Sequence, residues 1–138
     1  MSTSWANISR KLSTLKEKMF EEIRDELCGD SFLVILFGSR ARGEETPLSD
    51  YDLLVIREHG GDRVVLKWPA QIFSYTVDEV FEELRRLNTL VLDAVLEGRF
   101  LCGDAQLFER LRKEAETIVE KRRLRKAENG WVFRDDGV

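Results

Sequence analysis

The chain has 138 residues, 43% of them hydrophobic and 35% charged, which excludes low-complexity and disordered classes and predicts one soluble globular domain. No apolar run approaches the ~20 residues of a membrane span, and no apolar signal-peptide core follows the first residues. We therefore expect no membrane association and a cytoplasmic location. With a formal net charge of -4, nucleic-acid binding would need a local basic patch, so a nucleic-acid partner stays open.

The apolar residues between Trp5 and Leu27 recur at steps of three and four, which predicts an amphipathic helix that ends near Gly29. The continuous apolar run 32–37 predicts a strand that is buried on both faces, and the apolar run 51–56 predicts a second strand. Residues 39–49 between them predict a loop with at most one helical turn. Downstream we expect strands over 64–68 and 71–76, a helix over 77–97 broken near Asn88, an extended piece over 99–102, and a last helix over 104–127.

This order predicts a single domain over 1–138 of the α/β (α+β) class, with a mixed central sheet flanked by helices. Its core spans about 30–104, the C-terminal helix about 104–127 and the tail 128–138. The tail contains Trp131, Val132 and Phe133, which form either a docking motif for a partner or a strap folded back on the body. The basic run 121–126 either contacts RNA or an acidic partner, or complements a helix C-terminus.

The two cysteines, Cys28 and Cys102, have no CxxC spacing and no accompanying histidine cluster. Neither a zinc site nor a disulfide framework is predicted from them. We expect both to be reduced, half-buried packing residues. The single histidine, His59, lies beside two glycines and is interpreted as an exposed turn residue.

The most informative stretch runs from Gly38 and Ser39 to Asp50 and Asp52. A glycine at the end of a buried strand lets the backbone approach a ligand closely, and the small hydroxyl after it suits a phosphate. Alternate side chains of a strand share a face, so Asp50 and Asp52 are expected to project to the same side. Two carboxylates beside phosphates are typical of a Mg²⁺ site. Arg40 and Arg42 could neutralise triphosphate charge, or at least one pairs with Glu44 or Glu45.

This pattern resembles the DNA polymerase beta superfamily, and in particular its minimal nucleotidyltransferases. The resemblance implies transfer of a nucleoside monophosphate from a nucleoside triphosphate to an acceptor, with Mg²⁺ as the cofactor. It assigns triphosphate contact to Ser39, beside Gly38, and metal binding to Asp50 and Asp52. Many such proteins are the antitoxins of HEPN-domain ribonucleases, in some cases adding AMP to a tyrosine of the toxin, so the resemblance also implies a HEPN-type partner.

One residue departs from the family pattern. The family usually carries a third carboxylate on a following strand, and Gln71 stands in that place. An amide cannot accept a proton from a hydroxyl as a carboxylate can. Three alternatives follow: activity is reduced, Asp78 or Glu79 substitutes, or the strand alignment is different.

The sequence thus predicts a nucleotidyltransferase that moves NMP, with ATP as the expected donor, to a hydroxyl acceptor on a HEPN-type partner. The alternative is a catalytically degenerate protein that keeps the fold and acts as a binding or antitoxin module. Modification of a small hydroxylated molecule is a weaker alternative, because no second domain is present to build its pocket. The sequence leaves open whether the chain forms a homo-oligomer, and it does not specify the acceptor.

Overall fold

The computed structural model describes residues 4–128 and 130–133. A five-stranded sheet lies at the centre, in the order β3-β4-β2-β1-β5. Strands β2 and β4 are parallel, and the other neighbours are antiparallel. The bounds of the strands are β1 Leu33–Phe37, β2 Tyr51–Arg57, β3 Val64–Lys67, β4 Ala70–Thr76 and β5 Arg99–Gly103.

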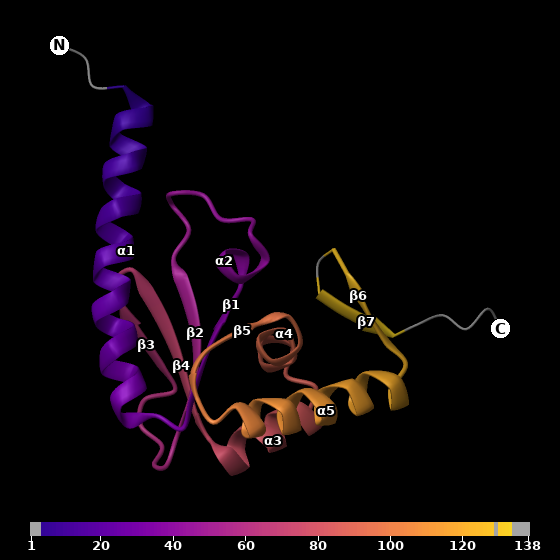
Figure 1. Cartoon of the computed structure of the whole chain (residues 1–138). Helices are drawn as coiled ribbons and strands as arrows, with labels where there is room; N and C mark the ends of the chain where they lie inside the picture. Colours follow the sequence, from indigo (N-terminus) through magenta and orange to yellow (C-terminus); the bar gives the residue numbers. More distant parts are fainter. Residues whose placement is uncertain (1–3, 129, 134–138) are drawn as a thin grey trace.

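Helices cover both faces of this sheet (Figure 1). The first helix packs on one face, and three later helices pack on the other. Short α2 joins β1 to β2 at one end of the sheet. The bounds of the helices are α1 Trp5–Asp30, α2 Ser39–Arg42, α3 Val77–Arg85, α4 Thr89–Glu97 and α5 Ala105–Lys121.

Two hydrophobic clusters, one on each face of the sheet, form the core. Leu33, Ile35 and Phe37 of β1 belong to the cluster under α3, α4 and α5. Val34 and Leu36 belong to the cluster under α1. Strand β1 is buried along its whole length, as its continuous apolar sequence predicts. The expected mixed sheet flanked by helices is confirmed.

Asn88 breaks the long apolar stretch 77–97 into α3 and α4. Its side-chain oxygen accepts hydrogen bonds from the backbone N–H groups of Leu90 and Val91 and caps α4. Thr76 and Glu79 form a capping box at the start of α3. These side chains satisfy backbone groups that a helix start leaves unpaired, so the break predicted near Asn88 is confirmed.

The last helix ends earlier than its sequence predicts. Helix α5 stops at Lys121, and the chain turns through Arg123, which has φ 51°. Strands β6 (Leu124–Ala127) and β7 (Gly130–Phe133) then form a separate hairpin. The helix expected to reach 127 was therefore wrong, because buried Leu124 joins the core from a strand rather than from the helix.

The hairpin folds back onto α4. Trp131 packs against the core, and its Nε1 donates a hydrogen bond of 2.7 Å to Asp93 Oδ1. Lys126 pairs with Asp93 and, at 3.7 Å, with Glu97. The tail was expected to be either a docking motif or a strap folded back on the body, and Trp131 lies as the strap predicts. Residues 129 and 134–138 of the expected tail lie outside the described residues.

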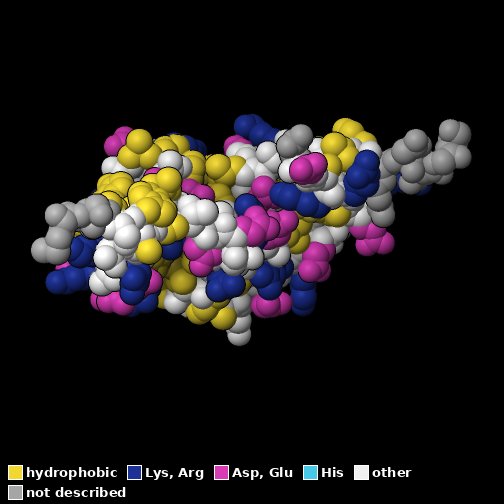
Figure 2. Space-filling view, turned by 90° about the horizontal axis from the view of Figure 1, so that it is seen from above, with side chains coloured by type: hydrophobic (Ala, Val, Ile, Leu, Met, Phe, Trp, Pro, Cys, Tyr) yellow, Lys and Arg dark blue, Asp and Glu magenta, His cyan; other side chains and the backbone are white. Residues whose placement is uncertain are grey.

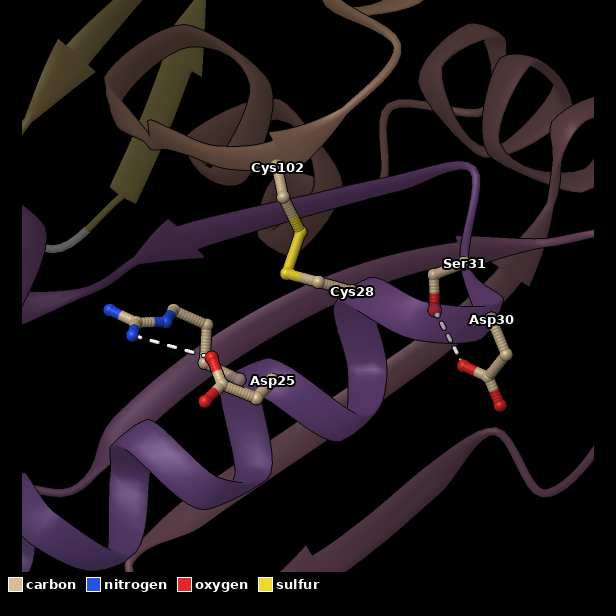
Figure 3. The surroundings of a disulfide bond; sticks show 6 residues. Asp25, Cys28, Asp30, Ser31 and Cys102 are labelled. Atoms are coloured by element: carbon tan, nitrogen blue, oxygen red, sulfur yellow. Dashed lines mark hydrogen bonds and ion pairs between the residues drawn. A yellow bond between two sulfur atoms is a disulfide. The ribbon is translucent and has the colours of Figure 1, made fainter.

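A disulfide joins Cys28 at the end of α1 to Cys102 of β5 (Figure 3). The two Cα atoms are 6.0 Å apart, a usual separation for bonded cysteines. The expectation of two reduced thiols was therefore wrong. The helix and the edge strand come together only in the folded chain, across 74 residues of sequence.

In the part of the chain that the structure describes, no helix is long and apolar enough to cross a membrane. Figure 2 looks onto the end of the molecule that carries α2, and hydrophobic side chains gather there towards the N-terminal part of α1. Trp5, Ile8 and Leu15 of this helix are exposed. His59 is exposed in the connection between β2 and β3, as predicted.

Candidate active site

The site begins at Gly38, where β1 ends and α2 starts. This residue has φ 76° and ψ -159°, a region of backbone conformation that is essentially restricted to glycine. A Cβ added to Gly38 would lie 2.4 Å from Asp52 Oδ2. The missing side chain thus leaves room for a carboxylate beside the turn.

Ser39 follows as the first residue of α2. The N–H groups of Ala41 and Arg42 donate to the carbonyl of Gly38. The N–H groups of Ser39 and Arg40 lie in the first turn of the helix, where backbone N–H groups have no acceptor within the helix. The turn thus provides backbone donors at the end of β1, and Ser39 contributes a hydroxyl to the same turn, as a phosphate-binding turn requires.

Asp52 lies on β2 between two neighbouring strands. It is in register with Phe37 of β1 on one side and with Gln71 of β4 on the other. Burial is the main cause that raises the pKa of the Asp52 carboxyl, and the charge of Asp50 raises it further, while Arg42 partly opposes the shift. Asp52 is therefore a half-buried carboxylate whose ionised form would be favoured by an added cation.

Asp50 lies just before β2 and bonds a side chain of α1, the helix on the face of the sheet opposite to α3, α4 and α5. Its Oδ1 accepts a hydrogen bond of 3.2 Å from Lys16 Nζ of α1. Asp50 precedes Asp52 by two residues, and its charge is the second cause that raises the pKa of Asp52. The structure thus brings together Gly38, Asp50, Asp52 and Gln71, the turn and the carboxylates that the sequence pattern selected.

The two arginines of α2 have partners within the protein. Arg40 donates from Nε and Nη2 to the carbonyl of Ser49, at 3.0 and 2.7 Å, and its guanidinium lies 4.1 Å from the ring centroid of Tyr51. Arg42 pairs with Glu44 at 3.2 Å and with Glu97 at 3.8 Å. The expected ion pair with Glu44 is confirmed for Arg42. Nucleotide binding by either arginine stays a prediction.

Neither Asp78 nor Glu79 can take the place of a third carboxylate. Both lie in the first turn of α3, just after Thr76, which pairs with Arg57 at the far end of β2. Five residues of strand separate that pair from Asp52 and Gln71, or about 16 Å at 3.3 Å per residue. Glu79 is also bonded to Arg63. This alternative was wrong, because α3 starts at the opposite end of the sheet.

Lys16 is the site residue that the motif does not reveal. Its side chain is 3% exposed, and it lies on the buried stripe of α1 together with Phe20, Ile23 and Leu27. The sequence does contain one signal for Lys16, since a charged residue stands among the apolar positions that form the buried side of α1. Such a residue is rarely buried without a partner, and here the partner is Asp50.

The donor set fits Mg²⁺ that is shared with phosphates. Within residues 4–128 and 130–133, no three His, Cys, Asp or Glu side chains form a group that could hold a metal ion. Mg²⁺ is often held by one or two carboxylates, with water and substrate phosphates completing its shell. Asp50 and Asp52 meet that requirement beside a turn where a Cβ would clash.

Comparison with known proteins supports the fold and identifies the family. A solved structure described as a toxin-antitoxin with AMP-PNP is 20% identical, with a TM-score of 0.51, over 77% of this chain and 87% of that one. A second, a mutant of the toxin-antitoxin MntA-HpeT, is 16% identical over the same shares, with a TM-score of 0.45. At these identities the likeness concerns the fold. The model of the nucleotidyltransferase domain matches residues 17–128, and the chain belongs to this family.

Proposed function

We propose that the chain transfers a nucleoside monophosphate, AMP in the first instance, from a Mg²⁺-bound nucleoside triphosphate to a hydroxyl group of a partner protein. The observation that carries this proposal is the contact between Gly38 and Asp52, where the absence of a Cβ leaves space for the carboxylate beside a phosphate-binding turn. Membership of the nucleotidyltransferase domain family supports the reaction class.

Each residue has a separate task in this proposal. Ser39 and the backbone N–H groups that begin α2 bind the triphosphate, and Asp50 and Asp52 hold the metal ion. When bound, Mg²⁺ neutralises phosphate charge and stabilises the developing charge in an in-line displacement. The acceptor oxygen forms a bond to the α-phosphorus, the bond to the β-phosphate oxygen breaks, and pyrophosphate leaves. The acceptor proton passes to a base, and the candidate is Asp52, the carboxylate in register with Gln71 on the neighbouring strand.

A partner protein is expected to supply the acceptor. Within the described residues the fold consists of the five-stranded sheet, its covering helices and the hairpin of β6 and β7 (Figure 1). The solved structure with AMP-PNP is of a toxin-antitoxin, which supports ATP as the donor and a toxin as the acceptor. A HEPN-type toxin is the partner that we expect. Transfer of AMP to that toxin would be the way in which the chain acts as an antitoxin.

A binding module is the second candidate, and Gln71 favours it. The residue opposite Asp52 on the neighbouring strand is an amide, which neither accepts a hydroxyl proton nor holds a metal ion as a carboxylate does. In that case the chain would bind nucleotide or toxin without transferring NMP. The two candidates differ in product, not in fold.

The test replaces both carboxylates by amides. We expect Asp50→Asn with Asp52→Asn to abolish Mg²⁺-dependent binding of AMP-PNP in calorimetry. In a parallel assay, labelled ATP, Mg²⁺ and the product of the neighbouring gene should give a labelled acceptor with the unmodified chain only. The matched control, Asp25→Asn with Asp30→Asn, removes the same charge at the far end of α1. Unchanged affinity in the first variant would refute the site, and binding without transfer would favour the binding module.

A further inference from the structure

Lys16 is a charged side chain that the protein buries almost completely. Its Nζ lies 3.2 Å from Asp50 Oδ1 and 3.1 Å from the carbonyl oxygen of Ser49. It also lies 5.8 Å from the ring centroid of Trp68. Burying an ammonium group is costly unless it is paired and hydrogen-bonded. Both oxygens belong to the segment that enters β2 at the candidate active site.

Arg40 of α2 contacts the same carbonyl. Its Nε and Nη2 both donate to Ser49. The guanidinium stacks on Tyr51, and the ring of Tyr51 stacks on Phe20 of α1, with centroids 3.9 Å apart and planes 1° from parallel. Two cations and an aromatic stack therefore fix the peptide that precedes Asp50.

This arrangement leaves one oxygen of Asp50 for a ligand. Lys16 engages Oδ1, and the Asp50 side chain is 40% exposed. A carboxylate that is fixed through one oxygen has lost its rotational freedom before a metal ion arrives, which lowers the entropic cost of coordination. The family model matches residues 17–128, and Lys16 lies just before that range.

We propose that Lys16 is a positioning residue, which fixes Asp50 in the orientation that coordinates the metal ion of the nucleotide complex. The inference rests on the proposed function, because it assumes that Asp50 is a metal ligand. It adds that α1, on the face of the sheet opposite to α4, takes part in building the metal site. Lys16 touches neither the nucleotide nor the acceptor in this role.

Electrostatics and positioning make opposite predictions for the loss of Lys16. Without its positive charge, Mn²⁺ should bind more tightly if the ammonium only repels the metal ion. If the ammonium positions Asp50, Mn²⁺ should bind more weakly in spite of the more negative site. The sign of the change in affinity therefore separates the two roles.

The experiment measures Mn²⁺ binding by electron paramagnetic resonance, with Mn²⁺ alone and with Mn²⁺ and AMP-PNP. We expect Lys16→Met to weaken binding in the presence of AMP-PNP at least tenfold, and Lys16→Arg, which keeps a cationic donor for Asp50, to weaken it less than Lys16→Met. Lys18→Met, on the exposed part of the same helix, is the matched control and should bind Mn²⁺ normally. Circular dichroism and the unfolding midpoint report whether each variant is folded.

Lys16→Gln keeps a hydrogen-bond donor and provides the test if Lys16→Met does not fold. A folded Lys16→Met or Lys16→Gln that binds Mn²⁺ as tightly as the unmodified chain, or more tightly, would overturn the proposal. Asp50→Asn separates this failure from that of the proposed function. If Asp50→Asn itself leaves Mn²⁺ binding unchanged, Asp50 is not a ligand and both inferences fail. If Asp50→Asn abolishes binding and the Lys16 variants do not weaken it, only the positioning role fails.

Discussion

Asp52 of β2 and Gln71 of β4 lie directly opposite each other on parallel neighbouring strands. Both residues share the face of the sheet that β1 completes with Phe37. A side chain at position 71 is therefore within reach of a metal ion held by Asp52. Because Gln71 lies opposite Asp52, the chemistry of its side chain bears directly on whether the chain acts as a transferase or as a binding module.

The substitution Gln71→Asp is expected to increase NMP transfer at least tenfold. A carboxylate here would add a metal ligand and a proton acceptor, and positioned general-base catalysis contributes about 10²–10⁴-fold. The measurement is the initial rate of label transfer from ATP to the partner, together with Mn²⁺ affinity. The control is Gln106→Asp at an exposed position of α5, which adds the same charge elsewhere. A Gln71→Asp protein with no gain in either quantity would favour the binding module.

The substitution Gly38→Ala should damage the site through the backbone and through Asp52. The conformation of Gly38 costs another residue about 1–3 kcal/mol, and the new Cβ would meet Asp52 Oδ2 at 2.4 Å. We expect a lower unfolding midpoint and loss of AMP-PNP binding. Gly61→Ala is the control, because a Cβ added to Gly61 would meet no atom within 4 Å. Equal affinities for AMP-PNP in both variants would contradict the assigned geometry.

The substitution Asp52→Asn should stabilise the metal-free protein at neutral pH. Because folding raises the pKa of Asp52, the folded chain binds more protons than the unfolded chain between the two pKa values. The free energy of unfolding therefore falls as pH rises through this window, and the penalty is complete above it. Asparagine removes the penalty, so the advantage of the variant should grow from acidic to neutral pH.

Urea denaturation across this pH range measures the effect, with the exposed Asp25→Asn as the control. Mg²⁺ with AMP-PNP should reverse the order, because a ligand that binds only the folded state stabilises the unmodified chain. An Asp52→Asn protein that is less stable than the unmodified chain at every pH would show that the carboxylate has a structural role instead.

The parts of the site that follow one another along the chain were predictable from the sequence. A buried strand, Gly38 and two aspartates close together in the chain are local patterns. The expected alternation does not apply to Asp50, because Asp50 lies before β2 and bonds Lys16 of α1, and alternation holds only within a strand. Gln71 could be placed because β4 is also a short apolar strand. The parallel register that places Gln71 opposite Asp52 depends on how the strands pair in the sheet, and the sequence pattern does not contain it.

Contacts between distant segments were not predictable in the same way. Lys16 meets Asp50 across 34 residues, and Cys28 meets Cys102 across 74. Periodicity shows that α1 has a buried stripe, but not which strands lie under it. The end of α5 was missed because the polar, charged residues before Leu124 suit a helix as well as a hairpin, and packing against α4 decides the outcome.

The substitution Trp131→Phe tests whether the hairpin is fastened to α4. It removes the hydrogen bond from Nε1 to Asp93 and keeps an aromatic ring, so we expect a loss of about 1 kcal/mol of stability. Limited proteolysis should then cleave the chain between α5 and β7 faster. Trp5→Phe, at an indole that is 62% exposed, is the control. Equal cleavage rates in both variants would show that the hydrogen bond from Trp131 to Asp93 does not hold the strap.

Reduction of the bond between Cys28 and Cys102 should lower stability without removing the fold. Cross-linking residues 74 apart restricts the unfolded chain by about 4.5 kcal/mol in the chain-entropy model. We expect dithiothreitol to shift the urea midpoint downward, and Cys28→Ser with Cys102→Ser to show the lower midpoint with or without the reductant. The helix would still be held by Phe20, Ile23 and Leu27 in the core. Thiol titration of the unreduced protein checks the premise, since two reactive thiols in the folded chain would contradict the disulfide itself.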